Sequence, residues 1–162
     1  MPLLPDSHVS SEPHPSMTKV YVSSVIDAPA ADVWRIVRDF NGLPSWTPFV
    51  AESRIEQNMR PDQVGCIRNF RLRDGGRIRE RLLSLSDYDL SYSYAILESP
   101  MAVEDYVASL SLTPITDGNR TFAEWQADFD CAPERESQLV RDIAENVFQS
   151  GFNALKRQLS GR

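Results

Sequence analysis

Six arginines surround a Gly-Gly pair and a single glutamate in the segment RNFRLRDGGRIRERL, residues 68–82. A carboxylate withdrawn from water can act as a general acid or base, and a neighbouring guanidinium can stabilise an enolate. Glu80 is therefore the candidate catalytic residue of the chain, provided that its side chain points away from solvent. That condition depends on the face of the hairpin on which it lies.

Other chemistry is limited by the residue types. The two histidines, His8 and His14, lie in the proline-rich start of the chain, so we expect no Ser/His/Asp or Cys/His centre and no imidazole metal site in the rest of it. No GxGxxG, P-loop or CxxC motif occurs, so neither a metal nor a cofactor is predicted. Cys66 and Cys131 lie in apolar, strand-like contexts and are expected to be buried free thiols.

Composition indicates one globular domain. The chain has 162 residues, 41% of them hydrophobic, and we expect a disordered leader over residues 1–16 and a single domain over 17–162. The net charge of -6 argues against nucleic acid as a partner. No apolar run is long enough for a membrane span and no secretory signal is recognisable, so a cytoplasmic location is predicted.

Hydrophobic periodicity predicts the elements. A strand over 19–26 precedes an amphipathic helix over 30–40 and a turn or short helix over 43–49. Six more strands are expected at 50–57, 65–73, 77–86, 89–97, 103–113 and 120–131. The last helix, 133–159, has an apolar stripe made of Leu139, Ile143, Val147, Phe148, Gly151, Ala154 and Leu155. This order predicts an α+β fold in which a curved antiparallel sheet wraps the last helix.

Strand alternation assigns faces to the arginine hairpin. A three-residue loop, Asp74-Gly75-Gly76, would bring the apolar faces of its two strands together. The inward pairs are then Leu72 with Ile78, Phe70 with Glu80, and Arg68 with Leu82. The outward pairs are Arg71 with Arg79, and Arg73 with Arg77.

Arg68 and Glu80 therefore lie diagonally across an otherwise apolar inner face, within reach of each other. A charge removed from water must be paired or must shift its pKa. Two interpretations stay open. The pair could be an ion pair that only holds the sheet, or a polar anchor inside a ligand cavity.

The outer arginines face one another, which is unfavourable unless acidic groups lie nearby. One interpretation is that Glu52 and Glu56 on the preceding strand, or solvent, screen them. The other is a partner surface, such as an acidic patch of a second subunit in a homodimer.

Three tyrosines also fall on predicted inward faces, Tyr92 and Tyr94 on one strand and Tyr106 on the next. Their hydroxyls need partners, which a wet cavity would supply; the alternative places them in solvent at the rim of the sheet. The predicted ligand-binding residues are Arg68, Phe70, Ile78, Glu80, Leu82, Tyr92, Tyr94, Ile96, Tyr106, Ile143, Val147 and Gly151.

Three stretches carry a resemblance to a known family: VSSVIDAPAADVWRIVRDFNGLPSW, VGCIRNFRLRDGGRIRERLLSL and YSYAILESPMAVEDYVASLSLTP. With the terminal helix they resemble the START-related, birch-pollen-allergen-like superfamily SRPBCC, in its polyketide cyclase/dehydrase-like branch, over residues 17 to 160. Membership implies a helix-grip fold, in which a seven-stranded curved antiparallel sheet wraps around the long C-terminal helix and encloses an apolar cavity. Two short helices follow the first strand in this fold.

The same stretches are similar to the plant abscisic acid receptors. That similarity implies that Asp74-Gly75-Gly76 corresponds to a gate loop and Ser99 to Ala102 to a latch, and that Glu80 and Tyr106 are cavity residues.

Three functions are compatible with these features. The first is binding or carriage of a small hydrophobic molecule, whose polar groups Arg68, Glu80, Tyr94 and Tyr106 would orient. The second is a cyclase or dehydratase acting on a polyketide-like or aromatic substrate, with Glu80 as general acid or base. The third is a protein-interaction module that uses the outer arginines. Binding is favoured, because the folded part lacks histidine and a paired acid and base.

Overall fold

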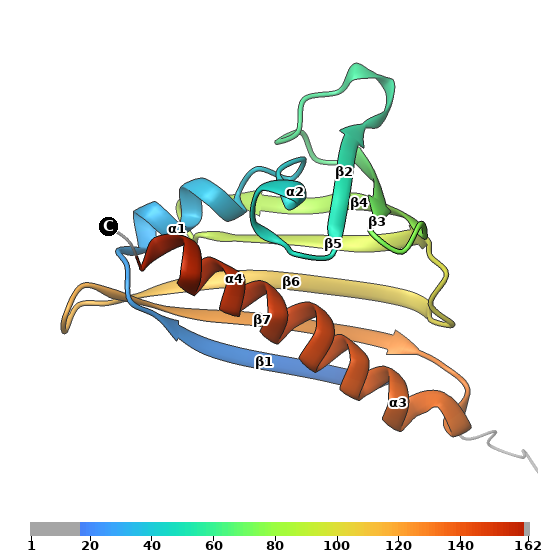
Figure 1. Ribbon diagram of the computed structural model, residues 1–162. Helices are drawn as coiled ribbons and strands as arrows, with labels where there is room; N and C mark the ends of the chain where they lie inside the picture. The colour runs from blue at the N-terminus through green and yellow to red at the C-terminus, as the bar shows by residue number, and fades with distance from the viewer. Residues whose placement is uncertain (1–16, 161–162) are drawn as a thin grey trace, which may run out of the picture.

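Seven antiparallel strands form one sheet in the order β1-β7-β6-β5-β4-β3-β2. The computed structural model describes residues 17–160, so the predicted leader lies outside the described residues and its boundary with the domain stays a prediction. The C-terminal helix crosses one face of the sheet (Figure 1), and α2 packs against the last part of this helix. The α+β helix-grip arrangement predicted from the sequence is confirmed.

The strand bounds lie within two residues of those expected. The strands are β1 (Thr18–Ile26), β2 (Val50–Ile55), β3 (Ile67–Leu72), β4 (Arg77–Ser86), β5 (Ser91–Glu98), β6 (Glu104–Ile115) and β7 (Arg120–Asp130). Strand β2 ends early in the short helix η1 (Glu56–Asn58), because Gln57 and Asn58 take positive φ angles that a strand cannot accommodate. After β1, the helices α1 (Ala30–Val37) and α2 (Leu43–Trp46) have the predicted order, and α1 ends before Phe40.

The C-terminal helix has four parts, η2 (Pro133–Arg135), α3 (Glu136–Arg141), η3 (Asp142–Gln149) and α4 (Ser150–Leu159). Segment η3 is π-helical, with wider turns than an α-helix. The buried stripe therefore jumps five residues at this point. Its members are Ile143, Phe148, Gly151, Phe152, Leu155 and Leu159. The predicted stripe contained Ile143, Phe148, Gly151 and Leu155 but missed Phe152 and Leu159. Its other members, Leu139, Val147 and Ala154, are half-buried.

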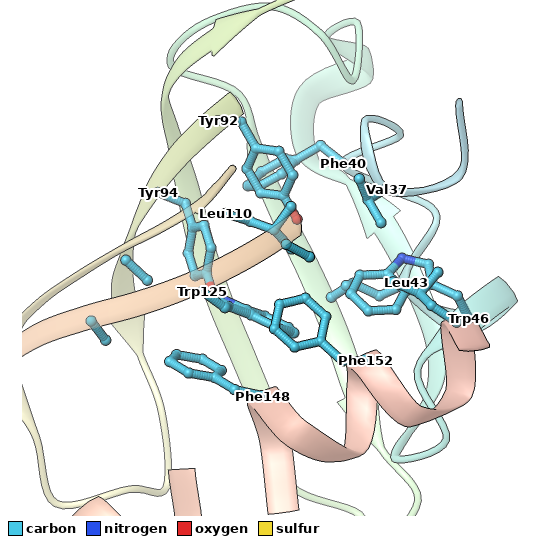
Figure 2. Packing of buried hydrophobic residues seen from close by; sticks show 14 of the residues in the cluster. Val37, Phe40, Leu43, Trp46, Tyr92, Tyr94, Leu110, Trp125, Phe148 and Phe152 are labelled. Carbon is cyan, nitrogen blue, oxygen red and sulfur yellow. The ribbon is translucent and has the colours of Figure 1, made fainter. Parts of the chain in front are cut away.

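Aromatic rings fill one half of the space between helix and sheet. Trp125 of β7 stacks on Phe148 at 4.5 Å between ring centroids, and Trp46 of α2 lies 5.7 Å from Trp125 (Figure 2). Gly151 faces both indoles, and a Cβ built on it would lie 2.9 Å from Cζ3 of Trp125 and 3.0 Å from Cζ3 of Trp46. The glycine permits close packing there, so its predicted place in a ligand cavity is wrong.

The β3–β4 hairpin has the predicted faces but a different register. Arg68 pairs directly with Glu80, and Phe70 with Ile78. Each partner differs by two residues from the prediction, so the inward and outward sets are preserved. The reason is the turn: Gly75, rather than Gly76, takes the positive φ of 100° that closes a three-residue loop starting at Arg73.

Candidate functional site

A pocket of about 520 Å³ occupies the other half of the space between sheet and helix. Its floor comes from β3, β4, β5 and β6, its roof from η3, and its mouth from the loops after α2, β3 and β5. The lining residues are Pro48, Phe49, Phe70, Leu72, Arg73, Asp74, Ile78, Glu80, Tyr94, Ile96, Met101, Tyr106, Ile143, Asn146 and Val147. Most of this lining is apolar, as small-molecule sites generally are.

The structure brings most of the predicted ligand-binding residues to this pocket. Those that line it are Phe70, Ile78, Glu80, Tyr94, Ile96, Tyr106, Ile143 and Val147. Four others lie deeper in the core and do not line it, namely Arg68, Leu82, Tyr92 and Gly151. Of the predicted gate loop, Asp74 reaches the mouth, whereas Gly75 and Gly76 do not line the pocket.

Five lining residues escaped prediction from the sequence: Pro48, Phe49, Leu72, Arg73 and Asn146. Met101, which also lines the pocket, lies in the Ser99 to Ala102 segment that the similarity to the plant receptors assigns to a latch. Pro48 and Phe49 belong to the loop after α2, where strand alternation assigns no face. Arg73 was expected on the outer face of the hairpin, but β3 ends at Leu72 and Arg73 lies in the loop that follows. Leu72 was placed on the inner face but omitted from the site. Asn146 lies in η3, where the wider turns bring an exposed residue to the mouth.

A buried ion pair forms the base of the site. Oε1 of Glu80 accepts a hydrogen bond from Nε of Arg68 at 2.8 Å and lies 2.8 Å from Nη2 of the same guanidinium. The remaining terminal nitrogen of Arg68 donates to the carbonyl oxygen of Phe40 at 3.1 Å, and the guanidinium lies 3.9 Å above the Phe40 ring. Arg68 is only 1% exposed and Glu80 5%. The arginine is therefore sealed in the core at 1% exposure and does not line the pocket.

Glu80 retains an unused oxygen. Among the described residues no hydrogen bond reaches Oε2, although Glu80 lines the pocket. Among the described residues, the side-chain polar atoms that are fully buried and have no hydrogen-bond partner are Asn41 Oδ1, Trp46 Nε1, Ser53 Oγ and Tyr92 Oη. Oε2 is not one of them, so part of its surface is left uncovered by the protein. Burial raises the pKa of the Glu80 carboxyl, and the charge of Arg68 opposes this rise.

The three tyrosines have different environments. Tyr94 accepts a hydrogen bond from Nε1 of Trp125 at 3.0 Å, and Tyr106 lines the pocket beside it. Tyr92 packs edge-on against Phe40 at 6.0 Å, with its hydroxyl sealed and unpartnered among the described residues. Burial raises the pKa of the Tyr94 and Tyr106 phenols well above the ordinary value, so both remain protonated at neutral pH. All three rings are buried, so their placement at the solvent-exposed rim is wrong.

Two of the four outer arginines, Arg71 and Arg79, form close ion pairs within the chain. Nε of Arg79 lies 2.7 Å from Oε2 of Glu56, and Nε of Arg71 lies 3.1 Å from Oε1 of Glu52. The hydrogen bonds with Arg79 lower the pKa of Glu56 to about 2. Screening by Glu52 and Glu56 is thus confirmed, and no second subunit is needed to balance these charges. The predicted homodimer stays a prediction.

Two larger hollows of the described chain lack a buried charged group. One of about 730 Å³ lies where β5 and β6 separate, and one of about 620 Å³ lies on the outer side of the C-terminal helix. Their charged residues are all exposed. Residues 17–160 contain no cluster of three or more His, Cys, Asp and Glu side chains suited to a metal, and none of their helices is long and apolar enough to cross a membrane.

Comparison with known proteins agrees with this geometry. A family model described as "Polyketide cyclase / dehydrase and lipid transport" matches residues 17–160. The match includes the whole sheet, the pocket and the whole C-terminal helix.

Solved structures share the fold. A Thermobifida fusca protein is 30% identical, with a TM-score of 0.78 over 86% of this chain and 91% of that one. A Nitrosospira multiformis protein is 25% identical, with a TM-score of 0.74 over 89% of this chain and 99% of that one. The XoxI protein of Bacillus cereus is 24% identical, with a TM-score of 0.79 over 89% and 96%. The similarity to plant abscisic acid receptors stays a prediction.

Proposed function

The chain belongs to the polyketide cyclase/dehydrase and lipid transport family, and we propose that it binds a small hydrophobic molecule in the pocket between the sheet and η3. Family membership supports ligand binding in a hydrophobic cavity in general terms. The observation that carries the proposal for this chain is the apolar pocket of about 520 Å³, at whose base a buried carboxylate presents one free oxygen.

The pocket and the packed half of the core have distinct roles in this proposal. The indoles of Trp46 and Trp125 pack against Gly151 and fix the distance between helix and sheet at this point. Segment η3 therefore cannot move closer to the sheet and fill the pocket unless this aromatic cluster also moves. The half-buried side chain of Val147 then faces space rather than a dry core. A ligand would bury apolar surface there that is otherwise in contact with water.

Filling the pocket tests the proposal. Val147→Trp places a large ring in the pocket, whereas Val107→Trp makes the same chemical change on the outer face of β6, at a residue that is 43% exposed. Binding is followed by the fluorescence of N-phenyl-1-naphthylamine, a neutral apolar probe. We expect saturable binding to the wild type and to Val107→Trp, and its loss in Val147→Trp. Equal binding by the two variants would contradict the proposal.

A second candidate function is proton transfer by Glu80. The observation that favours it is a buried carboxyl whose pKa is raised and whose Oε2 opens into the pocket, as a general acid or base requires. A β-hydroxyacyl thioester analogue is a suitable substrate for a dehydratase assay by absorbance of the conjugated product. If Glu80 transfers the proton, Glu80→Gln abolishes turnover and leaves probe binding unchanged. Absence of turnover in the wild type would leave binding as the function.

A further inference from the structure

The charged residues that line the pocket indicate which class of ligand it selects, a conclusion that rests on the proposed binding function. The charged residues that line it are Glu80 at the base and Arg73 and Asp74 at the mouth. The base offers a ligand no cation among the described residues, because Arg68 is paired with Glu80, is only 1% exposed and does not line the pocket. What Glu80 offers there is therefore an anionic acceptor, with no cation that a ligand can reach.

Oε2 of Glu80 is that acceptor. Only Oε1 of the carboxylate accepts a hydrogen bond from Arg68. Because Glu80 is 5% exposed, water has little access to Oε2 except through the pocket. A hydrogen bond to a charged acceptor is stronger than one between neutral groups. An unmet acceptor in such a place favours a ligand that donates.

A second polar group completes the arrangement. The phenol of Tyr106 also lines the pocket, and its raised pKa keeps it a neutral hydroxyl that can donate to a ligand oxygen. A ligand hydroxyl could thus donate to Glu80 and accept from Tyr106. A ligand carboxylate would instead bring a second negative charge to a buried carboxylate, which is costly without a free cation.

We infer that the pocket selects an uncharged amphiphile, such as a phenol or an alcohol, whose hydroxyl donates to Oε2 of Glu80, and that it rejects carboxylates. The selection follows from the partner that Arg68 already has. If the guanidinium were free, the same pocket would favour the opposite class of ligand.

Three naphthalenes that share one ring system test this selection by isothermal titration at pH 7: 2-naphthol, 2-methoxynaphthalene and 2-naphthoate. 2-Naphthol is expected to bind about 10- to 100-fold more tightly than 2-methoxynaphthalene, which can only accept a hydrogen bond. 2-Naphthoate is expected to bind more than about 100-fold more weakly than 2-naphthol. Equal affinity of the first two compounds, or tightest binding of 2-naphthoate, would overturn the inference.

Paired variants locate the source of the discrimination. Arg68→Met combined with Glu80→Met removes both buried charges at similar volume, and it should abolish the preference for 2-naphthol. Arg71→Met combined with Glu52→Met removes an ion pair from the outer face of the same sheet and should keep that preference. If the buried double variant does not fold, the affinities of the wild type for the three naphthalenes still test the selection.

The mouth supplies one competing explanation. Arg73 is exposed there, with Nε donating to the carbonyl of Pro48 at 2.8 Å, and its terminal nitrogens could hold a carboxylate. Tight binding of 2-naphthoate that is weakened by Arg73→Gln would show that the polar group lies at the mouth, and would overturn the inference. Loss of N-phenyl-1-naphthylamine binding at Val147→Trp together with equal naphthalene affinities would leave the proposed function standing and only the selection wrong.

Discussion

The contact between Gly151 and the two indoles predicts how much the free energy of unfolding falls when one methyl group is added at this position. Replacing Gly151 by alanine should gain about 1 kcal/mol from helix propensity. The new Cβ would however lie 2.9 Å from Trp125 and 3.0 Å from Trp46. Neither ring can retreat easily, because Trp125 stacks on Phe148 at 4.5 Å and both indoles are buried. Overpacking costs about 1–3 kcal/mol, and the rigid neighbours place this site at the upper end.

The expected net effect of Gly151→Ala is a loss of about 2 kcal/mol in the free energy of unfolding, or roughly 4–8 °C in Tm. Thermal unfolding followed by circular dichroism measures it. Ser150→Ala is the control, since it adds alanine at the neighbouring helix position without approaching an indole, and it should leave Tm unchanged or slightly raised. A higher Tm for Gly151→Ala would refute the close packing of helix on sheet.

Two further predictions concern pH and thiol reactivity. Because the pKa of Glu56 falls from 4.5 to about 2 on folding, its contribution to stability should be complete above pH 4.5 and be lost as pH falls towards 2. In urea unfolding between pH 5 and 2, the free energy of unfolding should therefore decline less steeply for Glu56→Gln than for the wild type. Parallel curves would argue against the ion pair with Arg79. Burial raises the pKa of the Cys66 thiol, so a thiol reagent at pH 8 should modify half-buried Cys131 before Cys66, and labelling of Cys66 in the native protein at the rate of Cys131 would contradict its burial.

The faces of the arginine hairpin could be predicted, but its register could not. Alternation in a strand has a period of two, so any register that keeps the apolar faces together gives the same inward set, with Glu80 and Arg68 inside. The choice among those registers depends on which glycine of the Gly75-Gly76 pair takes the positive φ, and both residues are equally able to do so. The consequence is functional, because direct pairing places Oε1 of Glu80 on Arg68 and leaves Oε2 for the pocket.

Most of the inner face of the long helix could be predicted, but the shift of its buried stripe could not. A period of 3.6 residues carries the apolar stripe from Ile143 to Val147, whereas the π-helical turns of η3 carry it to Phe148. Sequence patterns do not reveal where such turns occur. The same shift separates Phe148 and Phe152, which pack on Trp125, from Val147, which lines the pocket. Pro48 and Phe49 at the mouth were missed because periodicity assigns no face outside regular elements, and Arg73 was missed because it was assigned to a strand that ends at Leu72.

Intermolecular nuclear Overhauser effects between bound 2-naphthol and the methyl groups of the protein test the location of the site most directly. The ring protons should contact the methyl groups of Ile78, Ile96 and Val147, which surround the pocket beside Glu80. Contacts with Val140 and Ala144 on the outer side of the helix would contradict a binding site between the sheet and the helix.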